Sequence, residues 1–362
     1  MAERDLRAPL AGALSLALAG ACGPRHVAPP PRIACVEGVR PGLRTPHVAW
    51  NGRGWSALVI DGHRLFLRAL AADGDAVGDP LLLSQDARDL EGASLVVSDG
   101  VERAAFVERS SGVVQVVRAS SGAEPRVASL DTPLAGALAL VARPGRGAAL
   151  FVETMRGVEL ATVAEDGDLG ARAACPRGVL PGAVVAQDDG YVALAATSRE
   201  GVQALWLDDR CRLRARRVLS ASPGSAHVRA MAADAAGPWV AYTDDAGAAW
   251  VAALGAAGLV RVAPRRLDGG MEHPSVVVEP DARGVTQAVR VLGLRRTEVD
   301  ARLVELRYDA AGRYIGLRSL LPDPVSGVEA VAPSPWGGAV VAFRRTDVAG
   351  NAGYSFLLRV CP

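Results

Sequence analysis

The 362-residue chain contains no lysine, and isoleucine occurs only at positions 33, 60 and 315. All 40 basic residues are therefore arginine, a pattern typical of GC-rich codon usage. The arginine count by itself does not indicate a phosphate-binding protein. With 39 acidic residues the formal net charge is +1, which leaves no basic footprint for nucleic acid. We therefore expect no nucleic-acid partner.

Aromatic residues are also scarce, at 4% of the chain, which argues against a carbohydrate-stacking groove. The catalytic motifs Gly-x-Ser-x-Gly, HExxH, the P-loop and CxxC do not occur. The sequence predicts no cofactor and no metal site. It favours a non-enzymatic protein without deciding the question.

Long apolar runs are missing too, since no stretch reaches the 18 residues of a membrane-spanning helix. The apolar stretch 8–21 is typical of a signal-peptide core, and it ends at Ala19-Gly20-Ala21-Cys22. This tetrapeptide resembles a bacterial lipobox, in which the cysteine is acylated, although it also suits ordinary signal-peptidase cleavage. We expect a signal peptide at 1–21, a lipidated Cys22 with a proline-rich tether at 22–31, and one domain at 32–362.

The rest of the chain is a repeat of short strand-like runs bounded by glycine, aspartate, serine or proline. The second strand of each repeat begins near positions 55, 103, 148, 191, 239, 285 and 338, so the period is 43 to 53 residues. Four strands at such a period are typical of a propeller. The sequence predicts an all-β, seven-bladed β-propeller, with a six-bladed ring as the alternative.

Closure of the ring follows from the chain ends. Six repeats have a fourth strand, whereas the seventh stops at Pro362 and would leave an unpaired edge. The run RIACVEGV (32–39) can supply the missing outer strand of the last blade. Cys35 and Cys361 would then lie on adjacent antiparallel strands, close enough for a disulfide.

Cys175 and Cys211 are the other candidate pair. Cys175 lies near the end of the third outer strand, and Cys211 lies in the turn before the fourth. Strand direction puts these positions on opposite faces of the ring, so their pairing stays open.

Three histidines, His47, His227 and His273, occupy the same repeat position, at the entry to the innermost strand. Together with Trp336 they are candidates for ligand binding at one mouth of the central channel. The alternative is a repeated structural contact, because equivalent positions in different blades are too far apart to share a metal ion.

Two further motifs have a structural interpretation. TDDAGAAW (243–250) resembles the Asp-box of sialidase-like propellers, but it occurs once and falls between the second and third strands, so we expect a polar turn. The arginine-rich run 210–217 could bind anions, but we expect an exposed strand on the rim of the ring.

Across 32–362 the chain resembles the broad class of exported bacterial β-propeller lipoproteins. The resemblance implies a monomer that is anchored in the cell envelope through its lipid, in the outer membrane of a Gram-negative bacterium. It implies a non-enzymatic platform for a protein, peptide or glycan. The alternatives are a glycoside hydrolase or lyase and an outer-membrane assembly scaffold.

Overall fold

The computed structural model describes most of the chain beyond residue 37. The described residues are 38–42, 44–87, 93–119, 124–143, 145–187, 189–197, 200–220, 227–234, 236–244, 246–267, 271–280, 285–297, 300–333, 338–345 and 354–361. They belong to one compact unit, Ala34–Pro362. The predicted signal peptide, Cys22 and the tether lie outside the described residues.

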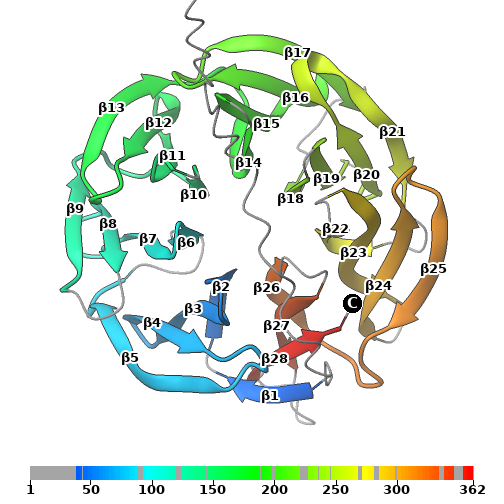
Figure 1. The fold of residues 1–362 in the computed structure, drawn as a ribbon, viewed down its shortest axis with the longest axis horizontal. Helices are drawn as coiled ribbons and strands as arrows, with labels where there is room; N and C mark the ends of the chain where they lie inside the picture. Colours follow the sequence, from blue (N-terminus) through cyan, green and yellow to red (C-terminus); the bar gives the residue numbers. More distant parts are fainter. Residues whose placement is uncertain are drawn as a thin grey trace, which may run out of the picture. The chain divides into compact units, whose positions relative to one another are not determined.

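Seven four-stranded antiparallel sheets form a ring, so the predicted seven-bladed propeller is confirmed and the six-bladed alternative is wrong (Figure 1). Blades are numbered along the chain, and each runs from its innermost to its outermost strand. The strands of blades 1 to 3 are β2 (Arg44–Trp50), β3 (Trp55–Asp61), β4 (Arg64–Leu70) and β5 (Ala76–Ser84); β6 (Ala93–Ser98), β7 (Val101–Val107), β8 (Val114–Ala119) and β9 (Arg126–Leu130); and β10 (Leu138–Ala142), β11 (Ala148–Thr154), β12 (Gly157–Val163) and β13 (Leu169–Ala174).

Blades 4 to 6 repeat the order, and blade 7 takes its outer strand from the start of the described chain. Their strands are β14 (Val179–Gln187), β15 (Gly190–Thr197), β16 (Gly201–Asp208) and β17 (Leu213–Ser220); β18 (His227–Asp234), β19 (Gly237–Thr243), β20 (Ala249–Leu254) and β21 (Val260–Arg266), with the 3-10 turn η2 (Ala256–Gly258); β22 (Met271–Pro280), β23 (Thr286–Arg296), β24 (Ala301–Asp309) and β25 (Tyr314–Ser319); and β26 (Gly327–Pro333), β27 (Ala339–Arg345), β28 (Tyr354–Val360) and β1 (Gly38–Gly42).

Burial follows the position of a strand within its blade. The second strands are buried on both faces because each sheet is packed between two others, so they read as continuous apolar runs, as in β11 and β15. The outer strands β5, β13 and β17 are mostly exposed and carry charged residues. The core is thus a series of apolar layers between blades.

The predicted closure of the ring by an N-terminal strand is confirmed, but the strand is Gly38–Gly42 and shares only residues 38 and 39 with the predicted run 32–39, whose earlier part lies outside the described residues. Strand β1 pairs antiparallel with β28, with Gly38 opposite Arg359 and Gly42 opposite Ser355. Pro41 is tolerated because an outermost strand needs hydrogen-bond donors on one side only. Cys361, which follows β28, is disulfide-bonded. Its predicted partner Cys35 lies outside the described residues, so that pairing stays a prediction.

Twist turns the strands within each blade. Adjacent strands rotate by roughly 20–25°, so the fourth strand is rotated by about 60–75° from the first. The outer strands therefore run along the circumference of the ring (Figure 1). As a result, the end of one outer strand approaches the hairpin that precedes the next outer strand.

Candidate functional site

The first candidate region is the channel mouth, where the innermost strands begin. His47 lies on β2 and hydrogen-bonds the backbone of Ala93, at the start of β6 in the next blade. Burial lowers the pKa of His47 to about 4, although this hydrogen bond opposes the shift. The imidazole is neutral at physiological pH and ties blade 1 to blade 2, as the structural interpretation expects.

The other residues predicted at the mouth fall on different blades. His273 lies on β22 with a left-handed backbone (φ 52°), beside Glu272, whose carboxylate accepts two hydrogen bonds from Arg296 at 2.8 and 3.0 Å. His227 begins β18, and its side chain lies outside the described part of the structure, as does Trp336. His47 and His273 belong to blades 1 and 6, which blade 7 separates.

Among the residues that the structure describes, no three histidine, cysteine, aspartate or glutamate side chains are grouped as a metal site would require. No described helix is long and apolar enough to cross a membrane.

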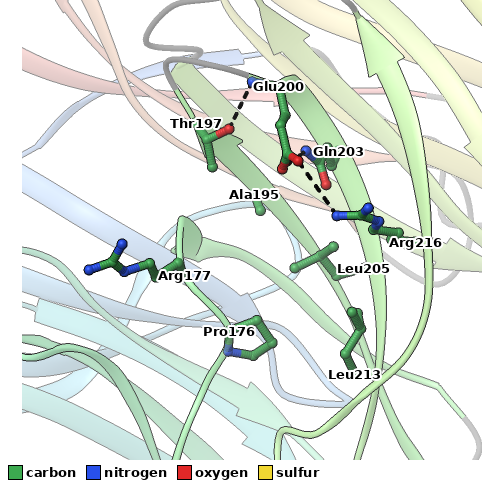
Figure 2. A pocket seen from close by; sticks show the side chains of 9 residues that line it. All are labelled: Pro176, Arg177, Ala195, Thr197, Glu200, Gln203, Leu205, Leu213 and Arg216. Atoms are coloured by element: carbon green, nitrogen blue, oxygen red, sulfur yellow. Dashed lines mark hydrogen bonds and ion pairs between the residues drawn. The ribbon is translucent and has the colours of Figure 1, made fainter.

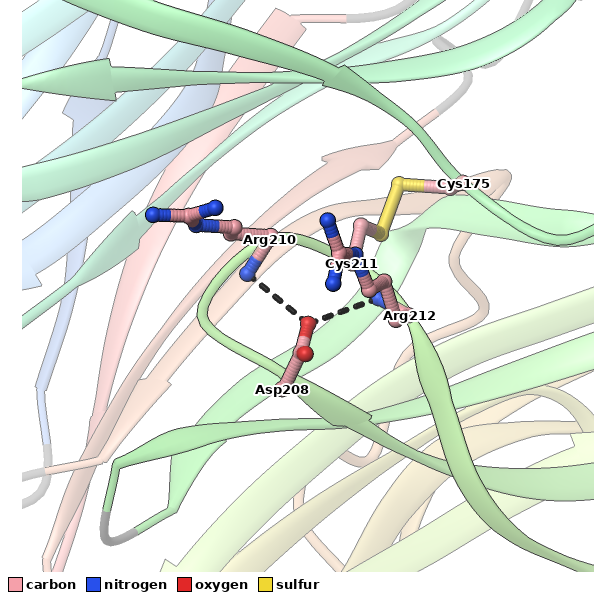
Figure 3. The surroundings of a disulfide bond; sticks show 5 residues. All are labelled: Cys175, Asp208, Arg210, Cys211 and Arg212. Atoms are coloured by element: carbon pink, nitrogen blue, oxygen red, sulfur yellow. Dashed lines mark hydrogen bonds between the residues drawn. A yellow bond between two sulfur atoms is a disulfide. The ribbon is translucent and has the colours of Figure 1, made fainter.

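The second candidate region is the outer junction between blades 3 and 4, where Cys175 and Cys211 form a disulfide with a Cα–Cα distance of 5.0 Å (Figure 3). Both cysteines lie where the sequence placed them, just after β13 and between β16 and β17. Strand direction alone places Cys175 and Cys211 on opposite faces of the ring, yet the two residues are bonded. Twist lays β13 along the circumference, so its end meets the hairpin of the next blade.

Cys211 occupies a position that other blades give to glycine. The same hairpin places Gly74, Gly167, Gly258 and Gly312 there in blades 1, 3, 5 and 6, all with φ between 74° and 99°. Cys211 adopts φ 61°, a conformation that costs about 1–2 kcal/mol for a residue with a Cβ. The cross-link is therefore built at a position where the backbone disfavours cysteine.

Asp208 stabilises this hairpin. One carboxylate oxygen accepts the backbone N–H groups of Arg210 and Arg212 at 2.9 and 2.8 Å (Figure 3). Slight burial raises the pKa of Asp208, but the two N–H donors outweigh it and lower the pKa below its usual range. Asp309 makes the equivalent contacts in blade 6.

A cavity of about 630 Å³ lies beside this disulfide (Figure 2). That volume is within the range of small-ligand sites, roughly 300–1,000 Å³. Its lining residues are Pro176, Arg177, Ala195, Thr197, Glu200, Gln203, Leu205, Leu213 and Arg216. One wall is the connection from β13 to β14, and the opposite wall is the face of blade 4 that is directed toward blade 3.

The connecting wall is fixed at both ends. At its start, the N–H of Cys175 donates to Val158 O at 2.9 Å, in addition to the disulfide. At its end, Ala196 N donates to Gly178 O at 3.0 Å. A Cβ on Gly178, whose φ is +80°, would come within 2.8 Å of Ala196 O, so only glycine fits there. Arg177 is held between these two anchors.

The opposite wall is apolar at its base and polar at its edge. Ala195 and Leu205 are buried, whereas Leu213 is 48% exposed although it lies on the same sheet face. At the edge, Gln203 Nε2 donates to Glu200 Oε2 at 2.7 Å, and Arg216 Nη1 lies 3.6 Å from Glu200 Oε1. The cavity thus combines an apolar floor with two arginines and one glutamate.

A third cluster lies on the face of blade 6 that is directed toward blade 7. Arg290 is 1% exposed and pairs with Glu279 at 3.2 Å and Glu305 at 2.8 Å. The more exposed Arg307 and Arg318 pair with the same two glutamates. Burial raises the pKa of Glu305, but Arg290 and Arg318 outweigh it and the pKa is lowered. Three arginines thus pair with two glutamates, and each glutamate has two arginine partners.

Two sequence interpretations are settled by the contacts. The arginine-rich run forms the exposed strand β17, as expected, with Arg214 paired to Asp189 and Arg217 donating to Gly258 O. The Asp-box-like segment lies between β19 and β20, as expected for a polar turn. There Asp244 accepts hydrogen bonds from Ala248 N and Trp250 Nε1.

No protein-family model matches the sequence, and no curated protein matches it. Solved structures do match in fold. The propeller domain of Cps50 (Swd1) from Myceliophteria thermophila has a TM-score of 0.55 at 11% identity, over 90% of this chain and 100% of that one. Virginiamycin B lyase from Staphylococcus aureus has a TM-score of 0.57 at 11% identity, over 90% and 99%.

The N-terminal part of BBS1, solved in complex with ARL6, is also similar, with a TM-score of 0.52 at 11% identity over 91% of this chain and 94% of that one. These likenesses include a lyase and a propeller that binds a protein. At such low identity they establish the β-propeller fold alone.

Proposed function

We propose that this protein is an exported, envelope-anchored monomer that binds a protein partner, with the cavity between blades 3 and 4 as its binding site. The observation that carries the proposal is that one wall of this cavity is held in place at both ends. Its wall is anchored by a disulfide placed at a glycine position, by Gly178 and by two backbone hydrogen bonds. A rigid wall beside an apolar floor reduces the entropy cost of binding.

The buried carboxylate pair of blade 6 favours binding over glycoside hydrolysis. A glycosidase needs one carboxylic acid whose pKa is raised so that it can donate a proton. Glu279 and Glu305 are the buried pair, but both accept hydrogen bonds from Arg290, and the pKa of Glu305 is lowered. Glu305 is therefore held as a carboxylate and is unsuited to act as a general acid.

Affinity purification of the full chain from its own envelope tests the binding site. We expect a partner to co-purify with the wild type and to be lost with Leu213→Asn. The matched control is Ile315→Asn, because Ile315 is 58% exposed on the outer strand of blade 6. A partner retained by both variants would place the binding site elsewhere, and one lost from both would indicate a nonspecific apolar effect.

Export and anchoring are tested separately. The mature protein should begin at Cys22 and carry the mass of an acylated cysteine, and Cys22→Ser should release it from the membrane fraction. A mature chain without the lipid mass would instead indicate ordinary signal-peptidase cleavage.

A further inference from the structure

We infer that the cavity between blades 3 and 4 binds an extended peptide segment of the partner that carries a carboxylate next to aliphatic side chains. This inference rests on the proposed binding function and names the chemistry of its ligand. It follows from three features of the cavity: its exposed apolar floor, its excess of positive charge and its position on the outer rim.

The aliphatic part of the ligand follows from the floor. Leu213, which lines the cavity, is 48% exposed, and Val218, outside the lining, is 58% exposed. They pair with Leu207 and Gln203 of β16, so they lie on one face of the sheet. Leu205 and Ala195 continue this face inward, where they are buried. Covering exposed leucine and valine with aliphatic side chains removes apolar surface from water, at about 25 cal/mol per Å².

The carboxylate follows from the charges. Arg177 and Arg216 lie on opposite sides of the floor, with Glu200 as the sole acidic residue in the lining (Figure 2). The Arg216–Glu200 pair is 3.6 Å long and has exposed side chains, so it is weak and readily exchanged. Arg177 is exposed and forms no ion pair with the described residues, so its guanidinium can turn toward a bound carboxylate.

The position on the rim favours a peptide over a free small molecule. The cavity lies between the connection to β14 and the outer strand β17, and its mouth includes the exposed side chains of Leu213 and Arg216. A small molecule would remain largely solvated there. An extended segment can place successive side chains along the sheet face and gain from each of them.

Fluorescence anisotropy with labelled pentapeptides tests the inference on the full chain. The probes are Gly-Leu-Glu-Leu-Gly, its glutamine counterpart Gly-Leu-Gln-Leu-Gly, and Gly-Ser-Glu-Ser-Gly. We expect the first to bind at least about fivefold more tightly than either of the others, because one lacks the charge and the other lacks the apolar groups. Raising NaCl from about 0.05 to about 0.5 M should weaken the acidic peptide selectively.

Variants then locate the binding. Arg177→Ala combined with Arg216→Ala should abolish the preference for glutamate over glutamine, and Leu213→Asn should weaken all aliphatic peptides. Arg156→Ala, which removes one positive charge at an exposed hairpin of blade 3, should leave binding unchanged. Because the arginines lie on the surface, thermal melting should show these variants to be folded.

Three results would overturn the inference. They are equal binding of the glutamate and glutamine peptides, binding that the arginine and Leu213 variants do not affect, and no binding of any peptide to the wild type. If partner capture still depends on Leu213 in any of these cases, the proposed binding site stands and only the ligand chemistry is wrong.

Discussion

The junction between blades 3 and 4 and the junction between blades 6 and 7 both contain an apolar layer, but they differ in what is added to it. The first is joined by the Cys175–Cys211 disulfide and leaves a cavity open beside it. In the second, the face of blade 6 is filled by Arg290 with Glu279 and Glu305, all largely buried. The disulfide thus adds a covalent link with open space beside it, whereas the buried charges need partners in close contact.

The difference indicates at which kind of junction a propeller can keep an unfilled cavity. A disulfide stabilises mainly by restricting the unfolded chain, so it does not require the space beside it to be filled. Buried ion pairs, by contrast, are stable only while each charge keeps its partners. This difference supports the proposal that the first junction binds a ligand, whereas the second contributes to stability.

Breaking the charge cluster should have the largest effect. Arg290→Met leaves two buried glutamates without their shared partner and should lower the free energy of unfolding by about 3–5 kcal/mol in urea denaturation. Arg307→Met, which removes a 44% exposed partner of Glu279, should cost less than about 1 kcal/mol. Equal losses in the two variants would show that burial of Arg290 is not the cause.

Removing the disulfide should have the next largest effect. The bond closes a loop with a sequence separation of 36 residues, so Cys175→Ala combined with Cys211→Ala should lower the stability by about 2–4 kcal/mol. The double variant is preferable to a reducing agent, because Cys361 is also disulfide-bonded. An unchanged urea midpoint in the double variant would contradict a structural role for this bond.

The backbone conformation of Cys211 should have a smaller effect on stability, which a comparison of glycine and alanine at this position measures. Cys175→Ala with Cys211→Gly should be about 1 kcal/mol more stable than Cys175→Ala with Cys211→Ala, because glycine adopts φ 61° without a steric penalty. The comparison uses two proteins that both lack the disulfide. If the alanine version were the more stable, the hairpin would not impose the glycine-like conformation.

Low pH should reduce the stability that the charge cluster of blade 6 contributes. The pKa of Glu305 is lowered in the folded protein, so its contribution to stability is present above its unfolded pKa, about 4.3, and is lost as the pH falls toward the folded value. Stability measured from pH 6 downward should therefore fall less steeply in Glu305→Gln than in the wild type. Parallel pH profiles would show that Glu305 is not coupled to Arg290 and Arg318.

The sequence was sufficient for much of the fold. Alternating and apolar runs, spaced by turn residues, determine which strands are sandwiched between blades. The absence of a fourth strand after β28 in the seventh repeat predicts closure by the N-terminal strand. The positions of Cys175 and Cys211 relative to their strands were also correct. Their contact was not predictable from strand direction, because it depends on the twist that accumulates from β10 to β13.

The candidate site was harder to predict. The histidine positions were visible in the repeat, and His47 proves to be a contact between blades. One signal for the second region was present in the sequence: aligning the outer hairpins places Cys211 where Gly74, Gly167, Gly258 and Gly312 stand. The cavity itself depends on how the connection that carries Arg177 lies against the face of blade 4 that carries Leu213, which no local pattern encodes.

Site-specific photo-crosslinking in the native envelope tests the central claim most directly. A photoreactive phenylalanine analogue would replace Leu213 in one protein and Ile315 in another, two exposed apolar positions on outer strands of different blades. We predict that position 213 crosslinks to one partner protein and that position 315 does not. Crosslinking of the same partner at 315, or at neither position, would contradict the assignment of binding to the junction of blades 3 and 4.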